Sequence, residues 1–413
     1  MSEGTTTKTK RSLERDLEKK QAKKSLARRY CSARRSRYIL CWLREIPNSS
    51  KMTWKDDGSE DWEPPSVPSS DSEESKVGAS RPRTKAMTAM FNDGSSRPSK
   101  TDRLVSDPNY REDHLEFNNI KLTSEKSDGP PPAFVLRTWE GIQQLRGEQS
   151  SPLVKEDFED LIRHQENGIS EADFLGFMLG NVLLQERDLE RLLGNSDVRM
   201  LLNVPFSREA VPGAIQPEHS RVSIPWPDVA YGYMKKAITS LQSLELATIT
   251  PTRGQVSKEL RFPFLVFEAK GSDGNMSVAL NQCLGGTATC ANAIKGLNSL
   301  AEGYGVDPME NIVFGIVMNE WAAAVYAMWW EADGGYFRQQ SIARFSFGAE
   351  DSVRGFRESL VKILRWGKDV RLKEIATTID KIREARLERE NAPKKRGRPP
   401  KKAGDNKRAK NHA

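Results

Sequence analysis

The sequence has few of the residues on which several common kinds of functional site depend. It contains only 4 histidines and 4 cysteines in 413 residues. The cysteines (Cys31, Cys41, Cys283 and Cys290) form no C-x₂-C pair, and no histidine stands at zinc-finger spacing. A histidine-based catalytic triad or a His-rich metal site is therefore not expected. Free thiols in a reducing compartment fit this cysteine usage best.

Long apolar runs are also missing. Hydrophobic residues make up 37% of the chain and charged residues 29%, which is too polar for a chain that is folded throughout. The N-terminal segment lacks the apolar core of a signal peptide, because Lys and Arg recur between Lys8 and Arg44. The most apolar helical run, residues 172–184, is too short to span a bilayer. We expect a soluble, intracellular protein with no membrane partner.

The N-terminal third differs in composition from the rest of the chain. Residues 1–50 are basic, and residues 51–127 are acidic or rich in Ser and Pro without apolar periodicity. We expect residues 1–127 to be a disordered tail and linker. The basic arm is either a solvated tail or a nuclear-localisation or nucleic-acid-binding segment. The net charge of +7 favours nucleic acid or another polyanion as a partner.

Residues 130–373 carry alternating helix and strand patterns and predict a mixed α/β domain, with a central mixed sheet flanked by helices. Ser170 followed by Asp173 predicts a helix start. The pair Gly285-Gly286 predicts an interruption in a later helix. Residues 374–392 predict a separate charged helix. Strands are expected at residues 198–206, 223–233, 262–270, 312–318, 321–330 and 336–347.

The stretch FPFLVFEAKG, residues 262–271, predicts a buried central strand that ends in charged residues. Side chains alternate faces along a strand, so Glu268 and Lys270 point to the same side. An acid and an amine at the end of a buried strand are costly unless they pair or hold an ion.

A second carboxylate is expected beside them. Asp228 starts the predicted strand at residues 223–233, and if that strand runs antiparallel to the first, Asp228 meets Glu268 and Lys270. Two carboxylates and a lysine at a sheet edge form an all-oxygen site suited to Mg²⁺. The alternative is a set of solvated or paired surface residues.

The order Pro227-Asp228, then Glu268-Ala269-Lys270 about forty residues later, resembles the PD-(D/E)XK nuclease signature. The surrounding pattern resembles a fungal nuclease-like family of that superfamily. The resemblance implies a restriction-endonuclease-like core, with Asp228 and Glu268 as Mg²⁺ ligands and Lys270 positioning the attacking water. It also implies an accessory glutamine on the next helix, here Gln282.

Some members of the superfamily carry a further metal-facing carboxylate on their first helix. Glu186 and Glu190 are the candidates for it in this chain. A solvated helix face is the alternative explanation of both.

The C-terminal segment, residues 393–413, contains KKRGRPPKK, which resembles an AT-hook. Its core is Arg396, Gly397, Arg398 and Pro399. The glycine lets the backbone lie deep in a narrow groove, where the two arginines follow the negative potential of A·T-rich DNA. The alternative is a basic localisation tail, and both imply the nucleus. Lysines flank the core and would contact phosphates: Lys394, Lys395, Lys401 and Lys402.

Together these features predict a nuclear, DNA-associated protein with one nuclease-like domain between disordered tails. If the site is active, the protein is a Mg²⁺-dependent phosphodiesterase tethered to A·T-rich DNA. The alternative is a non-catalytic chromatin-binding or effector-type protein that keeps a degenerate nuclease scaffold.

Overall fold

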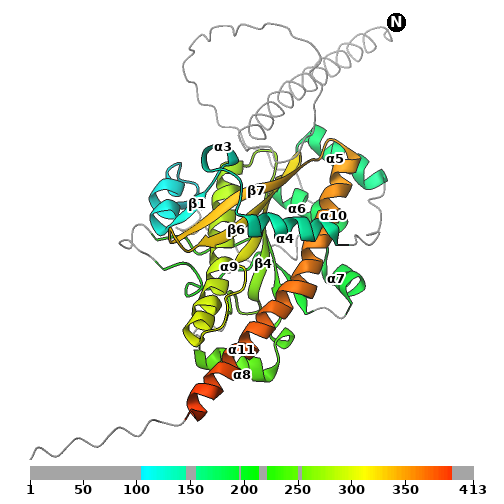
Figure 1. Ribbon diagram of the computed structural model, residues 1–413. Coiled ribbons are helices and arrows are strands. Elements are labelled where there is room, and N and C mark those ends of the chain that lie inside the picture. Colours follow the sequence, from blue (N-terminus) through cyan, green and yellow to red (C-terminus); the bar gives the residue numbers. More distant parts are fainter. Residues whose placement is uncertain (1–103, 146–154, 195–196, 214–220, 250–253, 393–413) are drawn as a thin grey trace, which may run out of the picture.

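The computed structural model describes residues 104–145, 155–194, 197–213, 221–249 and 254–392, which are coloured in Figure 1. The helices are α3 (Glu125–Asp128), α4 (Ala133–Gln144), α5 (Lys155–Asn167), α6 (Glu171–Asn181), α7 (Glu186–Leu193), α8 (Ser240–Ile249), α9 (Met276–Tyr304), α10 (Glu350–Trp366) and α11 (Leu372–Asn391). Short helical turns are η2 (Arg111–Leu115), η3 (Glu116–Asn118), η5 (Lys235–Ala237) and η6 (Gly367–Arg371). The strands are β1 (Ile120–Leu122), β2 (Val198–Leu202), β3 (Val229–Tyr233), β4 (Arg261–Lys270), β5 (Ile312–Asn319), β6 (Ala322–Glu331) and β7 (Tyr336–Ser346).

The strands of the described ranges form one mixed sheet of seven, in the order β1-β7-β6-β5-β4-β3-β2. β1 is parallel to β7 and β4 is parallel to β5, whereas the other neighbours are antiparallel. The predicted fold class, a mixed α/β protein with a central mixed sheet flanked by helices, is confirmed. Strand β4 lies inside the sheet between β3 and β5, and all 10 of its residues are buried.

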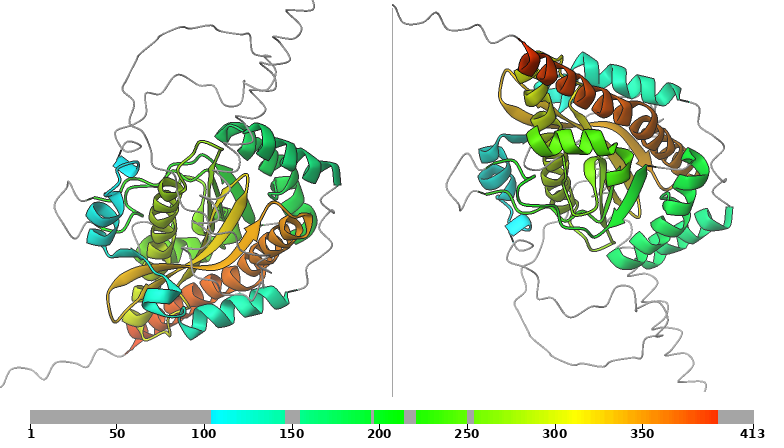
Figure 2. Two further views of the ribbon diagram at one scale, coloured as in Figure 1. Left: turned by 90° about the horizontal axis from the view of Figure 1, so that it is seen from above. Right: turned by 90° about the horizontal axis from the view of Figure 1, so that it is seen from below.

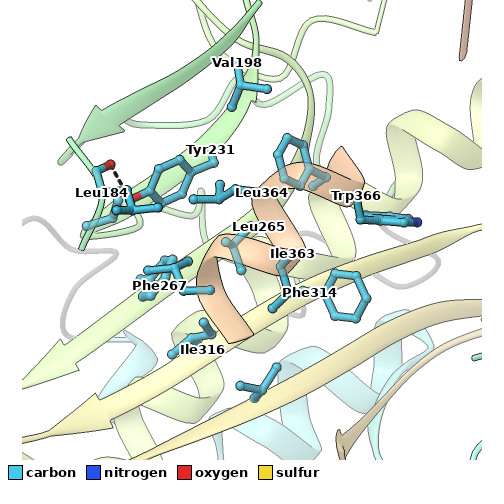
Figure 3. Close-up of a cluster of buried hydrophobic side chains, with 14 of the residues drawn as sticks. Leu184, Val198, Tyr231, Leu265, Phe267, Phe314, Ile316, Ile363, Leu364 and Trp366 are labelled. Atoms are coloured by element: carbon cyan, nitrogen blue, oxygen red, sulfur yellow. Dashed lines mark hydrogen bonds between the residues drawn. The ribbon is translucent and has the colours of Figure 1, made fainter. Parts of the chain in front are cut away.

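Two apolar cores form on the two faces of the sheet. Leu265 and Phe267 of β4 belong to the core that includes α4, α6, α7, α10 and α11, whereas Val266 belongs to the core under the first half of α9. This alternation is the period-two geometry expected of a strand. Figure 2 shows the two faces covered by different helices. Part of the first core appears in Figure 3, where the Tyr231 hydroxyl donates a hydrogen bond of 3.0 Å to the Leu184 carbonyl.

Pro263 lies inside β4 although proline has no N–H for a strand ladder. The register between β3 and β4 shifts between Tyr231 and Tyr233, so the ladder is irregular at this point. A Cβ on the intervening Gly232 would lie 2.9 Å from the Pro263 Cα, so only glycine allows this approach. The bulge accommodates the proline, and beyond it the register is regular toward the charged end of β4.

The expected interruption at Gly285-Gly286 is wrong, because α9 runs unbroken through both glycines. A Cβ on Gly286 would lie 3.2 Å from Val266 Cγ1 of β4, and one on Gly285 would lie 3.7 Å from Val222. A similar approach occurs one strand away, where a Cβ on Gly315 would lie 2.5 Å from Cys283 Sγ. Gly286 and Gly315 therefore allow the helix to lie close to the sheet, whereas the contact at Gly285 is an ordinary one. At Gly286 this packing outweighs the low helix propensity of glycine.

The expected start of order near residue 130 is also wrong. Residues 104–127 include η2, η3 and β1, and β1 pairs with the edge strand β7. Tyr110, Leu115 and Ile120 are buried in the core under α9. This segment is part of the folded domain, and residues 1–103 lie outside the described residues.

Helix α11, the charged C-terminal helix of the sequence analysis, packs on the same domain as the sheet. Ile375, Ile379 and Ile382 are buried in the main core. The Arg386 guanidinium binds both carboxylate oxygens of Glu245 on α8 at 2.8 Å. The folded domain therefore extends to the end of α11.

Two of the cysteines, Cys283 and Cys290, are free and buried. Burial raises the pKa of the Cys290 thiol well above its ordinary value, so it is not a nucleophile at neutral pH. Cys31 and Cys41 lie outside the described residues. In the ranges that the structure describes, no helix combines the length and the apolar character needed to cross a membrane.

Candidate functional site

Asp228 lies beside the charged end of β4. Strands β3 and β4 run antiparallel with Val229 opposite Phe267, so Asp228, one residue earlier, faces the position of Glu268. The Asp228 Oδ2 accepts a hydrogen bond of 2.7 Å from the Ala269 N–H. The antiparallel pairing assumed in the sequence analysis is present, and it brings Asp228 to the Glu-x-Lys segment.

Glu268 is buried without full compensation for its charge. The residue is 1% exposed, and its Oε2 has no hydrogen-bond partner among the described residues. Burial raises the pKa of Glu268 well above its ordinary value, and the Asp228 carboxylate raises it further, whereas Lys270 opposes the shift. Burial raises the pKa of the Cys283 thiol on α9, and the Glu268 carboxyl group adds to that rise.

The other two charges of the cluster are also perturbed. Burial raises the pKa of Asp228 to about 6, although Lys270 and the Ala269 N–H favour its ionised form. Burial alone would lower the pKa of Lys270, but Asp228, Glu171 and Glu268 raise it overall. Lys270 therefore stays protonated at neutral pH, while the two carboxyl groups compete for its charge.

Glu171 is the member of the cluster that the sequence reasoning missed. Its Oε1 lies 3.0 Å from the Lys270 Nζ, and it is the first residue of α6. The start of α6 is fixed by Ser170, whose hydroxyl accepts the Asp173 N–H as expected. Glu186 and Glu190, the proposed first-helix acids, lie on α7, and the ion pairs of the described residues join neither of them to Lys270.

Hydrogen bonds join the loop after β4 to the segment directly before α6. The Ser272 N–H donates to the Ile169 carbonyl at 3.0 Å, and the Ile169 N–H donates to the Ser272 hydroxyl at 2.8 Å. A Cβ on Gly271 would lie 2.5 Å from the Glu171 nitrogen. Only glycine permits this contact, which places Glu171 within reach of Lys270. In the sequence, Gly271 directly after Lys270 indicates that another segment could approach the backbone closely at this point. It does not indicate that this segment is the start of α6.

Gln282 does not join the charged cluster in this structure. Successive residues of a helix point about 100° apart, and its neighbour Cys283 is the one that packs on the sheet, against Gly315 of β5. Gln282 lies instead against the loop before β3, beside Ser223 and Trp226. Its Oε1 is buried and has no hydrogen-bond partner in the described part of the chain.

The donor set at the end of β4 suits a hydrated divalent cation. Asp228 and Glu268 offer carboxylate oxygens, and the unpartnered Glu268 Oε2 is the kind of buried atom that a cation would satisfy. The described residues contain no cluster of three or more His, Cys, Asp or Glu side chains arranged around one point. Mg²⁺ needs only one or two carboxylates because it keeps several water ligands. The residues therefore fit Mg²⁺ with Asp228 and Glu268 as its two protein ligands.

The residues of the AT-hook-like segment lie outside the described residues. Their predicted contact with DNA stays a prediction. They are Lys394, Lys395, Arg396, Gly397, Arg398, Pro399, Lys401 and Lys402.

Comparison with known proteins gives one family match. Residues 182–379, just under half of the chain, match the model of a domain of unknown function (DUF7924). The matched region contains Asp228, Glu268, Lys270 and Gln282, and it begins after Glu171. No curated protein matches the chain. The chain is thus similar over its central region to a family whose function is unknown.

Proposed function

We propose that the protein is a nuclear, DNA-associated protein with a PD-(D/E)XK nuclease-like domain that hydrolyses phosphodiesters with Mg²⁺. One observation carries the proposal: the sheet brings Asp228 and Glu268 to one point with Lys270, and leaves a buried Glu268 oxygen without a partner. Perturbed carboxylates with a specific cationic neighbour are typical of functional sites. A restriction-endonuclease-like core is consistent with the mixed sheet.

The side chains divide the chemistry between them. Asp228 and Glu268 would hold the cation, which would polarise a phosphate oxygen and lower the pKa of a bound water. Lys270, protonated at neutral pH, would orient that water and stabilise negative charge rather than remove a proton. Glu171 holds the ammonium group in place through their 3.0 Å contact. Gln282 would act on the substrate beside the charged cluster rather than on the cation.

A cleavage assay tests this proposal. The full chain is incubated with single- and double-stranded DNA and RNA, with Mg²⁺ or with EDTA. We expect Mg²⁺-dependent cleavage that Glu268→Gln abolishes and that Glu190→Gln, an exposed acid on α7, leaves intact. Cleavage that survives Glu268→Gln would remove these residues from the mechanism.

The alternative, a non-catalytic protein on an inherited scaffold, is favoured by how closed the site is. Glu268 is 1% exposed and Lys270 is 9% exposed. The Lys270–Glu171 pair also joins α6 to β4, as a purely structural ion pair would. If this alternative holds, Mg²⁺ gives neither cleavage nor any rise in the melting temperature. A Mg²⁺-dependent rise that Glu268→Gln removes would favour the metal site.

DNA association is proposed on the basis of the sequence of the C-terminal segment. Its Arg396-Gly397-Arg398 core would lie in the minor groove of A·T-rich DNA, and its lysines would contact phosphates. This tether would deliver the domain to chromatin.

A further inference from the structure

The loop directly before Asp228 presents an aromatic side chain to solvent. Trp226 is 53% exposed and Ile224 is 37% exposed, whereas Val222, Pro225 and Pro227 of the same loop are buried. Tryptophan is costly to leave in water, and an exposed aromatic beside a functional site is a frequent mark of binding. The Trp226 Cα lies at most about 7 Å from the Cα of Asp228, two residues later, so the loop at Trp226 is close to the charged cluster.

Behind this loop lies a small cavity that we call the Trp226 pocket. Its volume is about 30 Å³, and it lies between the loop, α9 and the segment before η2 that contains Val105 and Tyr110. That volume holds about one water molecule or one polar substituent of a ligand. The lining residues used below are Tyr110, Ser223, Ile224, Trp226, Asn281 and Gln282.

The Trp226 pocket contains a buried polar atom that is unsatisfied. The Gln282 Oε1 is buried and has no hydrogen-bond partner among the described residues, and the buried Ser223 hydroxyl faces the Tyr110 hydroxyl. Ser223 is 6% exposed, and its own N–H is already bonded to the Tyr110 hydroxyl at 3.0 Å. Buried groups of this kind are rare in folded proteins and call for a specific explanation. A ligand that brings a hydrogen-bond donor into the pocket would satisfy the Gln282 Oε1.

Arg111 adds a positive charge at the same place. Its Nε donates a hydrogen bond of 2.9 Å to the Asn281 Oδ1, and it is half-buried. The carboxylates of Glu112 and Glu116 act on its charge, but in the part of the chain that the structure describes neither forms an ion pair with it. A partly desolvated guanidinium held by a neutral amide keeps its charge available for an anion such as a phosphate.

We propose that the Trp226 pocket binds the base of an unpaired nucleotide next to the scissile phosphate. The base stacks on Trp226, a polar group on its edge enters the pocket and meets Ser223 and Gln282, and Arg111 contacts the adjoining phosphate. A base in a duplex is stacked and paired, so its face is closed to Trp226. The inference rests on the proposed nuclease function and assigns it single-stranded or locally opened nucleic acid as substrate.

The test measures binding without cleavage. A fluorescein-labelled single-stranded oligonucleotide and the duplex of the same mixed sequence are titrated with the full chain in EDTA. Trp226→Ala should weaken single-strand binding about tenfold and change duplex binding little. Trp226→Phe should keep most of the affinity because it keeps an aromatic face. Leu244→Ala, at a 63% exposed side chain on α8, is the matched control and should change neither.

Gln282 provides a second measurement. Gln282→Leu keeps the size of the side chain but removes its polar groups, so it should change the preference among single strands of different base composition. Unchanged single-strand affinity in Trp226→Ala would overturn the proposal, and so would equal losses for single strand and duplex.

The nuclease function and the pocket can fail independently. Single-strand binding that depends on Trp226, in a protein with no Mg²⁺-dependent cleavage, would support the pocket and reject the nuclease. The opposite outcome is cleavage that depends on Glu268 while Trp226→Ala cuts single strands as fast as the unaltered protein. It would support the nuclease and reject the pocket.

Discussion

Glu268 and Arg371 are each 1% exposed, and they lie in different parts of the fold, one at the end of β4 and the other in the turn before α11. Two Arg371 nitrogens donate to main-chain carbonyls, at 2.6 Å to Glu310 and 3.0 Å to Ile312. Glu374 lies 3.2 Å away as a counter-charge. Each side chain also has one buried atom without a hydrogen-bond partner in the described residues, the Arg371 Nε and the Glu268 Oε2. The difference is that Arg371 has a counter-charge and two acceptors, whereas the nearby Asp228 repels the charge of Glu268.

The difference separates a buried charge that holds the fold together from one that does not. Two main-chain carbonyls and the Glu374 carboxylate contact Arg371, so its removal leaves those groups unsatisfied. Nothing comparable is lost when the Glu268 charge is removed, because the unliganded protein already holds that carboxyl group at a free-energy cost. Natural proteins keep such destabilising groups mainly where function needs them.

The largest expected effect is at Arg371. Arg371→Met should lower the free energy of unfolding by about 3–5 kcal/mol, because Glu374 and two carbonyls lose their buried partner. Urea denaturation followed by tryptophan fluorescence measures it. Arg354→Met, at an exposed arginine on α10, should change stability by about 0.5 kcal/mol or less. Equal effects of the two substitutions would mean that Arg371 is not a structural centre.

Glu268→Gln should have the opposite sign. Without metal at pH 7, the substitution removes a buried and repelled carboxylate but keeps its shape, so the free energy of unfolding should rise by about 1–3 kcal/mol. The same denaturation in EDTA measures it. With excess Mg²⁺ the unaltered protein should gain stability and the variant should not. A variant that is less stable in EDTA would place Glu268 in the structural class with Arg371.

The pH dependence of stability gives a smaller effect at Asp228. Its folded-state pKa of about 6 exceeds the ordinary value of 3.8. Between these values the folded state binds more protons than the unfolded state, so the free energy of unfolding falls as pH rises through this window. Because the residue is half-buried, we expect a fall of about 1–2 kcal/mol, which Asp228→Asn should remove. Urea denaturation in EDTA between pH 4 and 7.5 measures the slope. The control is Asp351→Asn, at a 95% exposed carboxylate, which should leave the slope of the free energy of unfolding against pH unchanged. If Asp228→Asn also leaves the slope unchanged, Asp228 is not its source.

The sequence predicted the part of the site that strands determine. The apolar run before Glu268 indicated a buried strand, and strand periodicity placed Glu268 and Lys270 on one side. Glu171 could not be found this way. It reaches Lys270 through contacts between Ile169 and Ser272, about a hundred residues apart, which no local pattern encodes.

The errors in the fold have the same origin. Gly285-Gly286 has a low helix propensity, but α9 is continuous through both residues, and Gly286 packs closely on Val266 of β4. Residues 104–127 are polar, and three of their buried side chains, His114, Asn118 and Thr123, are themselves polar, so burial leaves no apolar pattern in this segment. In both places, tertiary contacts outweighed the local signal.

The smallest expected effect concerns charges in the C-terminal segment, which contrast with those of the folded site in their response to salt. Interactions between exposed charges and phosphates weaken as salt rises, whereas metal binding between buried carboxylates is screened much less. Replacing Arg396 and Arg398 with Ala should erase a preference of several-fold for A·T-rich over G·C-rich duplex, since only the arginines enter the groove. Replacing Lys394, Lys395, Lys401 and Lys402 should weaken binding to both duplexes alike and flatten the salt dependence. Fluorescence anisotropy at several salt concentrations measures both, with a chain that ends at Asn391 as the baseline. If the intact protein binds the two duplexes equally well near physiological salt, the segment does not act as an AT-hook, and the domain must find nucleic acid through its own surface.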